Sequence, residues 1–369
     1  TLADTYVDQA ITYENTNRPV KNAYSGYRGT MTIRDALKYS CNTIAVQCFR
    51  DVTPRLGYTY LKDLGFEKVT DHEIINGQVF DDAREPTALG GITNGVSTLE
   101  LTAAYAAIAN GGTYTKPVFY TKILDQNGDV VLENKPKTTE VFRESTAYLL
   151  TSALESVVND EGGTGNGLKL DNMPVAGKTG TTSATRDVWF AGFTPYYTCA
   201  VWGGYDTNEF LEDDCKSFHK NLWKKVMDRI HADLPYVDFE IPSTVKQATI
   251  CTSSGLLAGS GCPTRTEYFE TSTIPTVRCT RHYVAPTPPP LPSPEASPSD
   301  SESNTDGDTT TGETTDSATG DGTTTDAGAS ATPSDTGGTG AAPPDASAPA
   351  AGGDPATPDT GGQDAAPAA

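Results

Sequence analysis

Apolar residues recur at helical spacing in several stretches of this chain. Ile33, Ala36 and Leu37 fall at i, i+3 and i+4. This spacing predicts a helix that begins after a capping residue, Thr32, and ends near Ser40. By the same reasoning, further helices are predicted over residues 43–52, 53–64, 98–110, 145–159 and 217–234.

The residue types at the helix ends add detail. Asn42 is a suitable cap for the helix over 43–52. Ser97 and Glu100 have the spacing of a capping box, and the small apolar face behind them predicts a buried helix. The last predicted helix carries a four-residue repeat that we expect to face the core: Phe218, Leu222, Val226 and Ile230.

Strand-like segments lie between these helices. The segment 120–133 predicts a hairpin with Asn127 and Gly128 at its turn. Two aromatic and β-branched runs, 187–193 and 196–205, predict paired antiparallel strands. A third strand should precede them and carry Lys178. The pattern therefore predicts an α+β (or α/β) fold, with an antiparallel sheet flanked by helices.

Composition divides the chain of 369 residues into three parts. We expect one domain over residues 1–242 and a small cysteine-bearing appendage over 243–285. Residues 286–369 are rich in Pro, Thr, Gly, Ala and Asp and hold no aromatic residue, which predicts a disordered tail. The tail holds fourteen of the 48 acidic residues and none of the 27 basic ones, so the net charge of −21 arises largely there.

Several classes of protein do not fit this sequence. Basic patches for nucleic acid are missing. No apolar run approaches the roughly 18 residues that span a bilayer, and no signal peptide is recognisable. The chain opens on Thr1 in sequence typical of a domain interior, so we expect a fragment or a processed piece.

The strongest candidate chemistry lies in the strand that contains Lys178. Lys178 offers a point charge with three donors. Thr179 and Thr181 alternate, so their hydroxyls share one face of a strand, and Gly180 leaves room for another backbone to approach. Such an edge can bind an extended peptide as an added strand. By itself, however, the stretch also fits an ordinary solvated lysine beside a turn glycine.

A second motif strengthens the functional interpretation. Ser40 and Asn42 form an S-x-N pattern upstream of Lys178, Thr179 and Gly180, the K-T-G pattern. The flanking sequences GVSTLELTAAYAAIANGG, GKTGTTS, RDVWFAGFTP and AVWGGYD agree. From about residue 1 to about 283, the chain resembles the transpeptidase domain of bifunctional class A penicillin-binding proteins. The resemblance implies a penicillin-binding/β-lactamase-like fold.

The resemblance also implies an activity, which is peptidoglycan cross-linking by acyl transfer from D-Ala-D-Ala stem peptides, with β-lactams acylating the same site. In that reaction Ser40 would relay protons and Lys178 would supply positive potential. Asn42 would bind the substrate amide. Thr179 and Thr181 would contact the substrate carboxylate beside Gly180, and the backbone N–H of Thr181 would serve the oxyanion.

One element of the family's chemistry is missing. The nucleophile motif S-x-x-K should precede Ser40, and residues 1–39 contain none. Two matches, Ser217 with Lys220 and Ser243 with Lys246, follow Lys178 and therefore have the wrong order. We expect no nucleophile in this chain and no covalent penicillin uptake. The parent would carry the motif, a glycosyltransferase and a membrane anchor upstream, at the extracellular face of the membrane.

Cysteine and histidine spacing predicts no metal site and no cofactor. Cys251, Cys262 and Cys279 lack C-x-x-C spacing, although a disulfide between two of them would suit an extracellular protein. The histidines show no ligand spacing; they are His72, His219, His231 and His282. No G-x-S-x-G elbow of a Ser-His-Asp hydrolase is present. Two alternatives stay open, a serine D,D-carboxypeptidase or β-lactamase, and a non-catalytic wall-binding module.

Overall fold

The computed structural model describes residues 1–282 except residues 15 and 208. The predicted tail, 286–369, lies outside the described residues. The α-helices are α1 Ile33–Lys38, α2 Asn42–Val52, α3 Pro54–Asp63, α4 Thr98–Ala109, α5 Glu144–Asn159 and α6 Phe218–His231. Short 3-10 helices are η1 Glu85–Leu89, η2 Ser183–Thr185, η3 Asp213–Cys215 and η4 Thr271–Thr273. Within the described part, none of the helices has the length and apolar character to cross a membrane.

The strands form small antiparallel sheets, of which the three-stranded one is central. The strands are β1 Thr5–Asp8, β2 Gly29–Thr32, β3 Glu73–Ile75, β4 Gln78–Phe80, β5 Thr113–Thr115, β6 Lys122–Leu124, β7 Val130–Glu133, β8 Thr138–Glu140, β9 Ala176–Thr181, β10 Asp187–Phe193, β11 Thr198–Gly204, β12 Val245–Cys251 and β13 Thr264–Glu270. The central sheet has the order β11-β10-β9, so β9 is an edge strand among the described residues.

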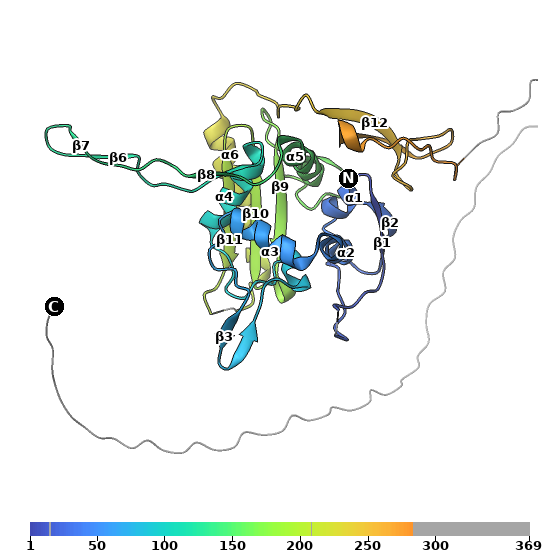
Figure 1. The fold of residues 1–369 in the computed structure, drawn as a ribbon, viewed down its shortest axis with the longest axis horizontal. Helices are drawn as coiled ribbons and strands as arrows, with labels where there is room; N and C mark the ends of the chain where they lie inside the picture. Colours follow the sequence, from blue (N-terminus) through green and yellow to red (C-terminus); the bar gives the residue numbers. More distant parts are fainter. Residues whose placement is uncertain (15, 208, 283–369) are drawn as a thin grey trace, which may run out of the picture. The chain divides into compact units, whose positions relative to one another are not determined.

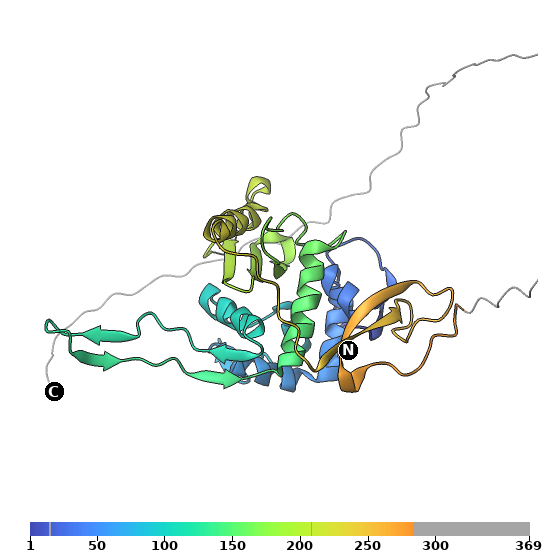
Figure 2. The same cartoon turned by 90° about the horizontal axis from the view of Figure 1, so that it is seen from above.

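Helices cover both faces of this central sheet, as predicted. Phe190 and Phe193 lie three residues apart on β10 and therefore point to opposite faces. Phe190 packs against α6, whereas Phe193 packs against α4 and α5. In Figure 2, α6 lies on one side of the sheet, and α4 and α5 lie on the other. The expectation of an antiparallel sheet flanked by helices is confirmed (Figure 1).

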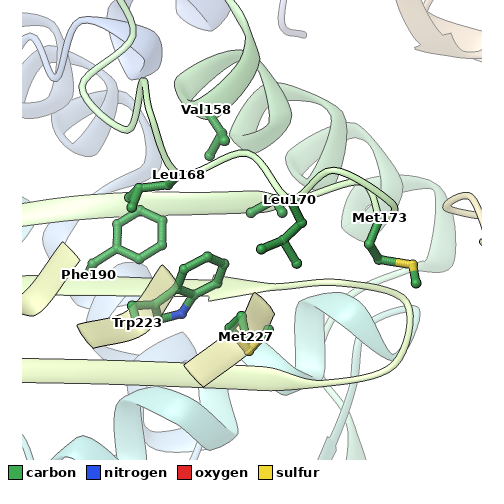
Figure 3. Close-up of a cluster of buried hydrophobic side chains, with 8 residues drawn as sticks. Val158, Leu168, Leu170, Met173, Phe190, Trp223 and Met227 are labelled. Atoms are coloured by element: carbon green, nitrogen blue, oxygen red, sulfur yellow. The ribbon is translucent and has the colours of Figure 1, made fainter. Parts of the chain in front are cut away.

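The core between the sheet and α6 is built around one tryptophan (Figure 3). Trp223 is fully buried, and its ring meets that of Phe190 edge-on with centroids 4.8 Å apart. Its indole N–H donates to the carbonyl oxygen of Cys199 at 3.0 Å, so the polar atom of this large side chain is satisfied. This contact fixes which side of α6 faces the sheet.

The predicted core face of α6 is therefore wrong by one residue. The apolar stripe expected inside is 39–44% exposed; it consists of Phe218, Leu222, Val226 and Ile230. The buried stripe has the same four-residue spacing and consists of His219, Trp223, Met227 and His231. The larger side chains of Trp223 and Met227 fill the space above the sheet. His231 is accommodated because its Nδ1 donates to the carbonyl oxygen of Met227 and its Nε2 lies 2.8 Å from Thr194 Oγ1.

Helix caps were predicted correctly except at α2. Thr32 caps α1 by accepting from the N–H of Asp35, and Ser97 forms its capping box at α4. Asn42 does not cap α2, because it is the first residue of that helix. The side chain of Asn22 accepts from the N–H of Asn42 at 2.9 Å instead. A distant residue thus takes the role that sequence proximity gave to Asn42.

Two hairpins extend from this body. The hairpin of β6 and β7 turns at Asn127 and Gly128 as predicted and projects from the fold (Figure 1). The hairpin of β12 and β13 packs against α5 and the N-terminal segment. Its buried Glu267 pairs with the guanidinium of Arg34 on α1, through N–O distances of 2.7 and 2.5 Å.

Candidate active site

One wall of the candidate site is the junction between α1 and α2, which carries Ser40. The N–H of Cys41 donates to the carbonyl oxygen of Ala36 at 2.8 Å, and that of Ser40 to Leu37 at 3.1 Å. These two bonds form a Schellman motif, in which Ser40 holds the left-handed position that glycine usually takes. The φ of Ser40 is 55°. A serine in this conformation costs about 1–2 kcal/mol, which indicates a use for its hydroxyl.

The opposite wall is the free edge of β9. Lys178 Nζ donates to Ser40 Oγ at 2.8 Å and to the carbonyl oxygen of Thr179 at 2.9 Å. Thr179 Oγ1 lies 2.8 Å from Thr164 Oγ1. The space that Gly180 leaves is bounded by β10, because a Cβ there would lie 3.1 Å from Cβ of Trp189. The two motifs, 138 residues apart in sequence, therefore meet in one hydrogen bond.

Between these walls lies a cavity of about 420 Å³. It brings together Ser40, Asn42, Thr179 and Thr181, four of the predicted site residues. Its other lining residues are Ala23, Tyr24, Arg28, Tyr39, Gly162, Thr164 and Lys220. None of these described lining residues is acidic, although the whole chain has a charge of −21. The cleft is thus a cationic site in an acidic protein.

Burial and charge lower the pKa values of the two lysines of the site. Burial, and secondly the neighbouring ammonium of Lys220, lower the pKa of Lys178 from 10.5 to about 8. Burial also lowers the pKa of Lys220. Lys178 is therefore mostly charged at neutral pH, but its proton is far easier to remove than that of an ordinary lysine. Both a carboxylate-binding role and a proton-transfer role need this balance.

Sequence reasoning missed Arg28, Lys220 and Thr164. The guanidinium of Arg28 lies 4.6 Å from the ring centroid of Tyr24 and 4.1 Å from that of Tyr39. Lys220 Nζ donates to the carbonyl oxygen of Thr164 at 3.2 Å. No local pattern identifies these residues, because they reach the cleft from segments that are brought together only by the fold.

The two late S-x-x-K matches do not place a serine in the cleft. Ser217 is the exposed N-cap of α6, and Ser243 is exposed just before β12. Neither lines the cavity, where Ser40 is the one serine among the described lining residues. Of the first match, only Lys220 reaches the site.

The cysteines near the C-terminus differ from the expectation of a disulfide. Cys251, Cys262 and Cys279 are free thiols. His282, which the sequence did not connect with them, lies beside two of their sulfur atoms. The missed signal is the spacing of Cys279 and His282, two ligand-type residues three positions apart.

Comparison with known families agrees with the cleft geometry. Residues 2–228 match the penicillin binding protein transpeptidase domain. The chain belongs to this family. Residues 241–283 match a second family, the C-terminal domain of penicillin-binding protein 1A. The family resemblance predicted from the S-x-N and K-T-G motifs is therefore confirmed.

Individual relatives support the same assignment. The chain is 35% identical over 281 residues to penicillin-binding protein 1A of Clostridium tetani, a match that covers 71% of this chain and 34% of the relative. It is 36% identical over 216 residues to penicillin-binding protein 1F of Bacillus subtilis, covering 56% and 28%. The chain thus spans about a third of the length of such relatives.

Solved structures of the family share the fold. Penicillin-binding protein 1A from Haemophilus influenzae aligns with a TM-score of 0.65 at 25% identity, over 76% of this chain and 46% of that one. PonA1 from Mycobacterium tuberculosis, solved in complex with penicillin V, aligns with a TM-score of 0.55 at 23% identity, over 64% and 66%. The predicted fold class is confirmed by this likeness.

Proposed function

We propose that the cleft between α1–α2 and β9 is part of a D,D-transpeptidase active site that cross-links peptidoglycan. The reaction is acyl transfer from a D-Ala-D-Ala stem peptide to an amine of a neighbouring stem. The observation that carries this proposal is the 2.8 Å hydrogen bond between Lys178 Nζ and Ser40 Oγ across the cleft. Family membership and the likeness to penicillin-binding protein 1A support it.

The direction of this hydrogen bond suits proton relay. A protonated lysine can only donate, so Ser40 Oγ accepts from Lys178 and its own hydrogen points elsewhere. Since Ser40 lines the cavity, that hydrogen is available to the leaving or attacking amine. With a pKa of about 8, Lys178 can replenish the proton that Ser40 gives away. The pair therefore acts as a general acid–base unit on the amine.

The remaining cleft residues recognise a peptide with a free carboxylate. Arg28, Lys220 and Lys178 supply positive potential, and Thr179 and Thr181 add hydroxyl donors at the edge of β9. That edge pairs with the extended substrate as an added strand, and the backbone N–H of Thr181 stabilises the oxyanion. β-Lactams bind in the same place as mimics of the D-Ala-D-Ala end.

Asn42 marks where the substrate amide binds. Its Nδ2 donates to the carbonyl oxygen of Lys21 at 2.7 Å, which fixes the orientation of the side-chain amide. Asn42 also lines an adjoining cavity of about 830 Å³, so the two cavities meet at this residue. A second stem peptide has room in this adjoining cavity beside the first.

The acylated serine belongs to a segment outside residues 1–369. No S-x-x-K precedes Ser40 in residues 1–39, and the serines of the later matches, Ser217 and Ser243, do not line the cleft. We infer that the parent carries this motif together with a glycosyltransferase and a membrane anchor, and works at the outer face of the cell membrane. The coverage of only about a third of the curated relatives supports a longer parent.

Labelling with a fluorescent penicillin tests two assignments: that the nucleophile lies outside residues 1–369, and that the cleft takes part in acylation. Residues 1–369 alone should show no mass increase and no label, whereas the product of the complete coding sequence should be labelled. In the complete product, Lys178→Ala and Ser40→Ala should slow acylation by about 10²–10⁴-fold, the range of general acid–base catalysis. An adduct on Ser217, Ser243 or Ser40 of the isolated chain would overturn the assignment of the nucleophile. Unchanged acylation in both variants would overturn the assignment of the cleft.

A further inference from the structure

Four ligand-type side chains converge at one end of the C-terminal hairpin. Cys251 ends β12, Cys262 lies in the loop between β12 and β13, and Cys279 and His282 lie after η4. One ligand atom from each residue can be chosen so that all four lie within 4.8 Å of one another. Cys251 and Cys279 are buried, and Cys262 and His282 are half-buried. Nothing in the transpeptidase chemistry uses these residues.

Two distances within this cluster match those of a tetrahedral metal site. His282 Nδ1 lies 3.5 Å from Cys251 Sγ and 3.6 Å from Cys279 Sγ. In a regular tetrahedron with Zn–S of about 2.3 Å and Zn–N of about 2.05 Å, sulfur and nitrogen lie about 3.6 Å apart. The thiols are not joined in disulfides. The cluster therefore has the size of a site with a metal ion at its centre.

Backbone contacts connect the segments that carry the four ligand-type residues. Leu257 pairs with Ile250 on one side and with Arg278 on the other, and the N–H of Cys279 donates to the carbonyl oxygen of Leu257 at 2.8 Å. These contacts join the loop, β12 and the final segment through the backbone.

A glycine close to the cluster adds a second feature. The N–H of Gly259 points at Cys262 Sγ, with an N–S distance of 3.3 Å. Backbone N–H groups of this kind orient metal-bound thiolates. A Cβ at Gly259 would lie 2.6 Å from the carbonyl oxygen of Cys279, so a side chain does not fit there. Glycine at this position thus lets the loop backbone approach both Cys262 and Cys279 closely.

We propose that Cys251, Cys262, Cys279 and His282 form a structural zinc site. Three thiolates and one imidazole are a preferred ligand set of Zn²⁺, whereas Mg²⁺ and Ca²⁺ prefer oxygen. Four protein ligands leave no open position for substrate or activated water, so the ion serves the fold. This proposal departs from the expectation of no metal site, which was based on the spacing of the cysteines and histidines.

The small core of the β12–β13 hairpin is consistent with stabilisation by a metal. Its buried apolar cluster is small: Ala3, Ile250 and Phe269, with Ala248 and Ile274 beside them. Small units that cannot bury a large core commonly depend on metals or disulfides. Zinc would join three segments of the hairpin that share few other apolar contacts, and would keep the thiols from oxidising.

The test uses the chain of residues 1–369, purified without a polyhistidine tag from cells supplied with zinc. Elemental analysis should give about one zinc ion per chain. Cys262→Ser and His282→Ala should each reduce the zinc content at least several-fold. Cys48→Ser is the matched control, because Cys48 lies in a different apolar cluster, and it should retain the metal.

A spectroscopic readout keeps the test valid if a variant folds poorly. Exchange of zinc for Co²⁺ in the unmodified chain should produce the visible absorption of a tetrahedral thiolate site. Removal of zinc by a chelator should expose three additional thiols to alkylation, mapped to Cys251, Cys262 and Cys279. A metal-free chain whose three thiols react freely would overturn the proposal. So would a disulfide between any two of them in chain purified with zinc present.

Discussion

Two buried cations in this protein have opposite surroundings. Arg34 is 5% exposed and is matched on every side: both carboxylate oxygens of Glu267, the carbonyl and hydroxyl oxygens of Ser152, and the hydroxyl of Ser156 accept from it. Lys178 donates to two neutral oxygens, and the charged group that perturbs its pKa is another cation, Lys220.

The difference in pairing between Arg34 and Lys178 distinguishes a cation that stabilises the fold from one that can still bind a ligand. A fully paired guanidinium holds three elements together and has no remaining capacity for a ligand. An ammonium with neutral partners keeps an unfavourable environment, seen in the lowered pKa of Lys178, and this is relieved when an anion arrives. Under the proposed function, Lys178 is therefore suited to bind an anion, whereas Arg34 is not.

The largest expected effect is the loss of stability when Arg34 loses its carboxylate partner. Glu267→Ala should lower the free energy of unfolding by about 3–5 kcal/mol, because it leaves the Arg34 charge buried without its partner. Urea unfolding measures the loss. The double variant Arg34→Met with Glu267→Leu is the control and should recover most of the stability. A loss under about 1 kcal/mol in Glu267→Ala would mean that water reaches the pair.

The next effect is a gain of stability when Ser40, which has a strained backbone and lies beside Lys178, is replaced by glycine. Ser40→Gly should raise the free energy of unfolding by about 1–2 kcal/mol, because glycine has no Cβ penalty at a φ of 55°. The same change removes the hydroxyl that accepts from Lys178, so acylation of the complete protein should fall. Ser40→Ala separates the two effects, since it should lose acylation without gaining stability. Equal stability of both variants would contradict the strain argument.

The last effect is a change of stability with pH. The folded pKa of Lys178 is about 8 and its ordinary value is 10.5, so the folded state disfavours the charged form. This penalty is fully present below pH 8 and disappears as pH rises toward 10.5. Lys178→Met should therefore melt at a higher temperature than the unmodified chain at pH 7, with a gap that narrows by pH 9.5. A gap independent of pH would assign the change to packing instead.

The sequence predicted those parts of the site whose secondary structure follows from local sequence patterns. A strand carrying Lys178, Thr179 and Thr181, and a helix junction carrying Ser40, follow from periodicity and capping alone. The fold class followed for the same reason. The variants of Ser40 and Lys178 described above test whether these residues have the roles that the family implies.

What the sequence could not predict depends on contacts between distant segments. The two stripes of α6 have identical spacing, and only the sheet beneath Trp223 decides between them. The cap of α2 comes from Asn22, a residue that Asp8 holds in place through a 2.8 Å hydrogen bond. Arg28 and Lys220 reach the cleft in the same way, from segments that no local pattern connects.

The shortness of α1 gives the C-terminal hairpin an unexpected importance. A helix of six residues is only about 9 Å long and far below the length at which helices persist alone. Its orientation is fixed near one end by Glu267 of β13, while Ser40 follows its other end. A chain truncated before residue 264 would keep the S-x-N and K-T-G motifs and still lose the ion pair that orients the helix before Ser40.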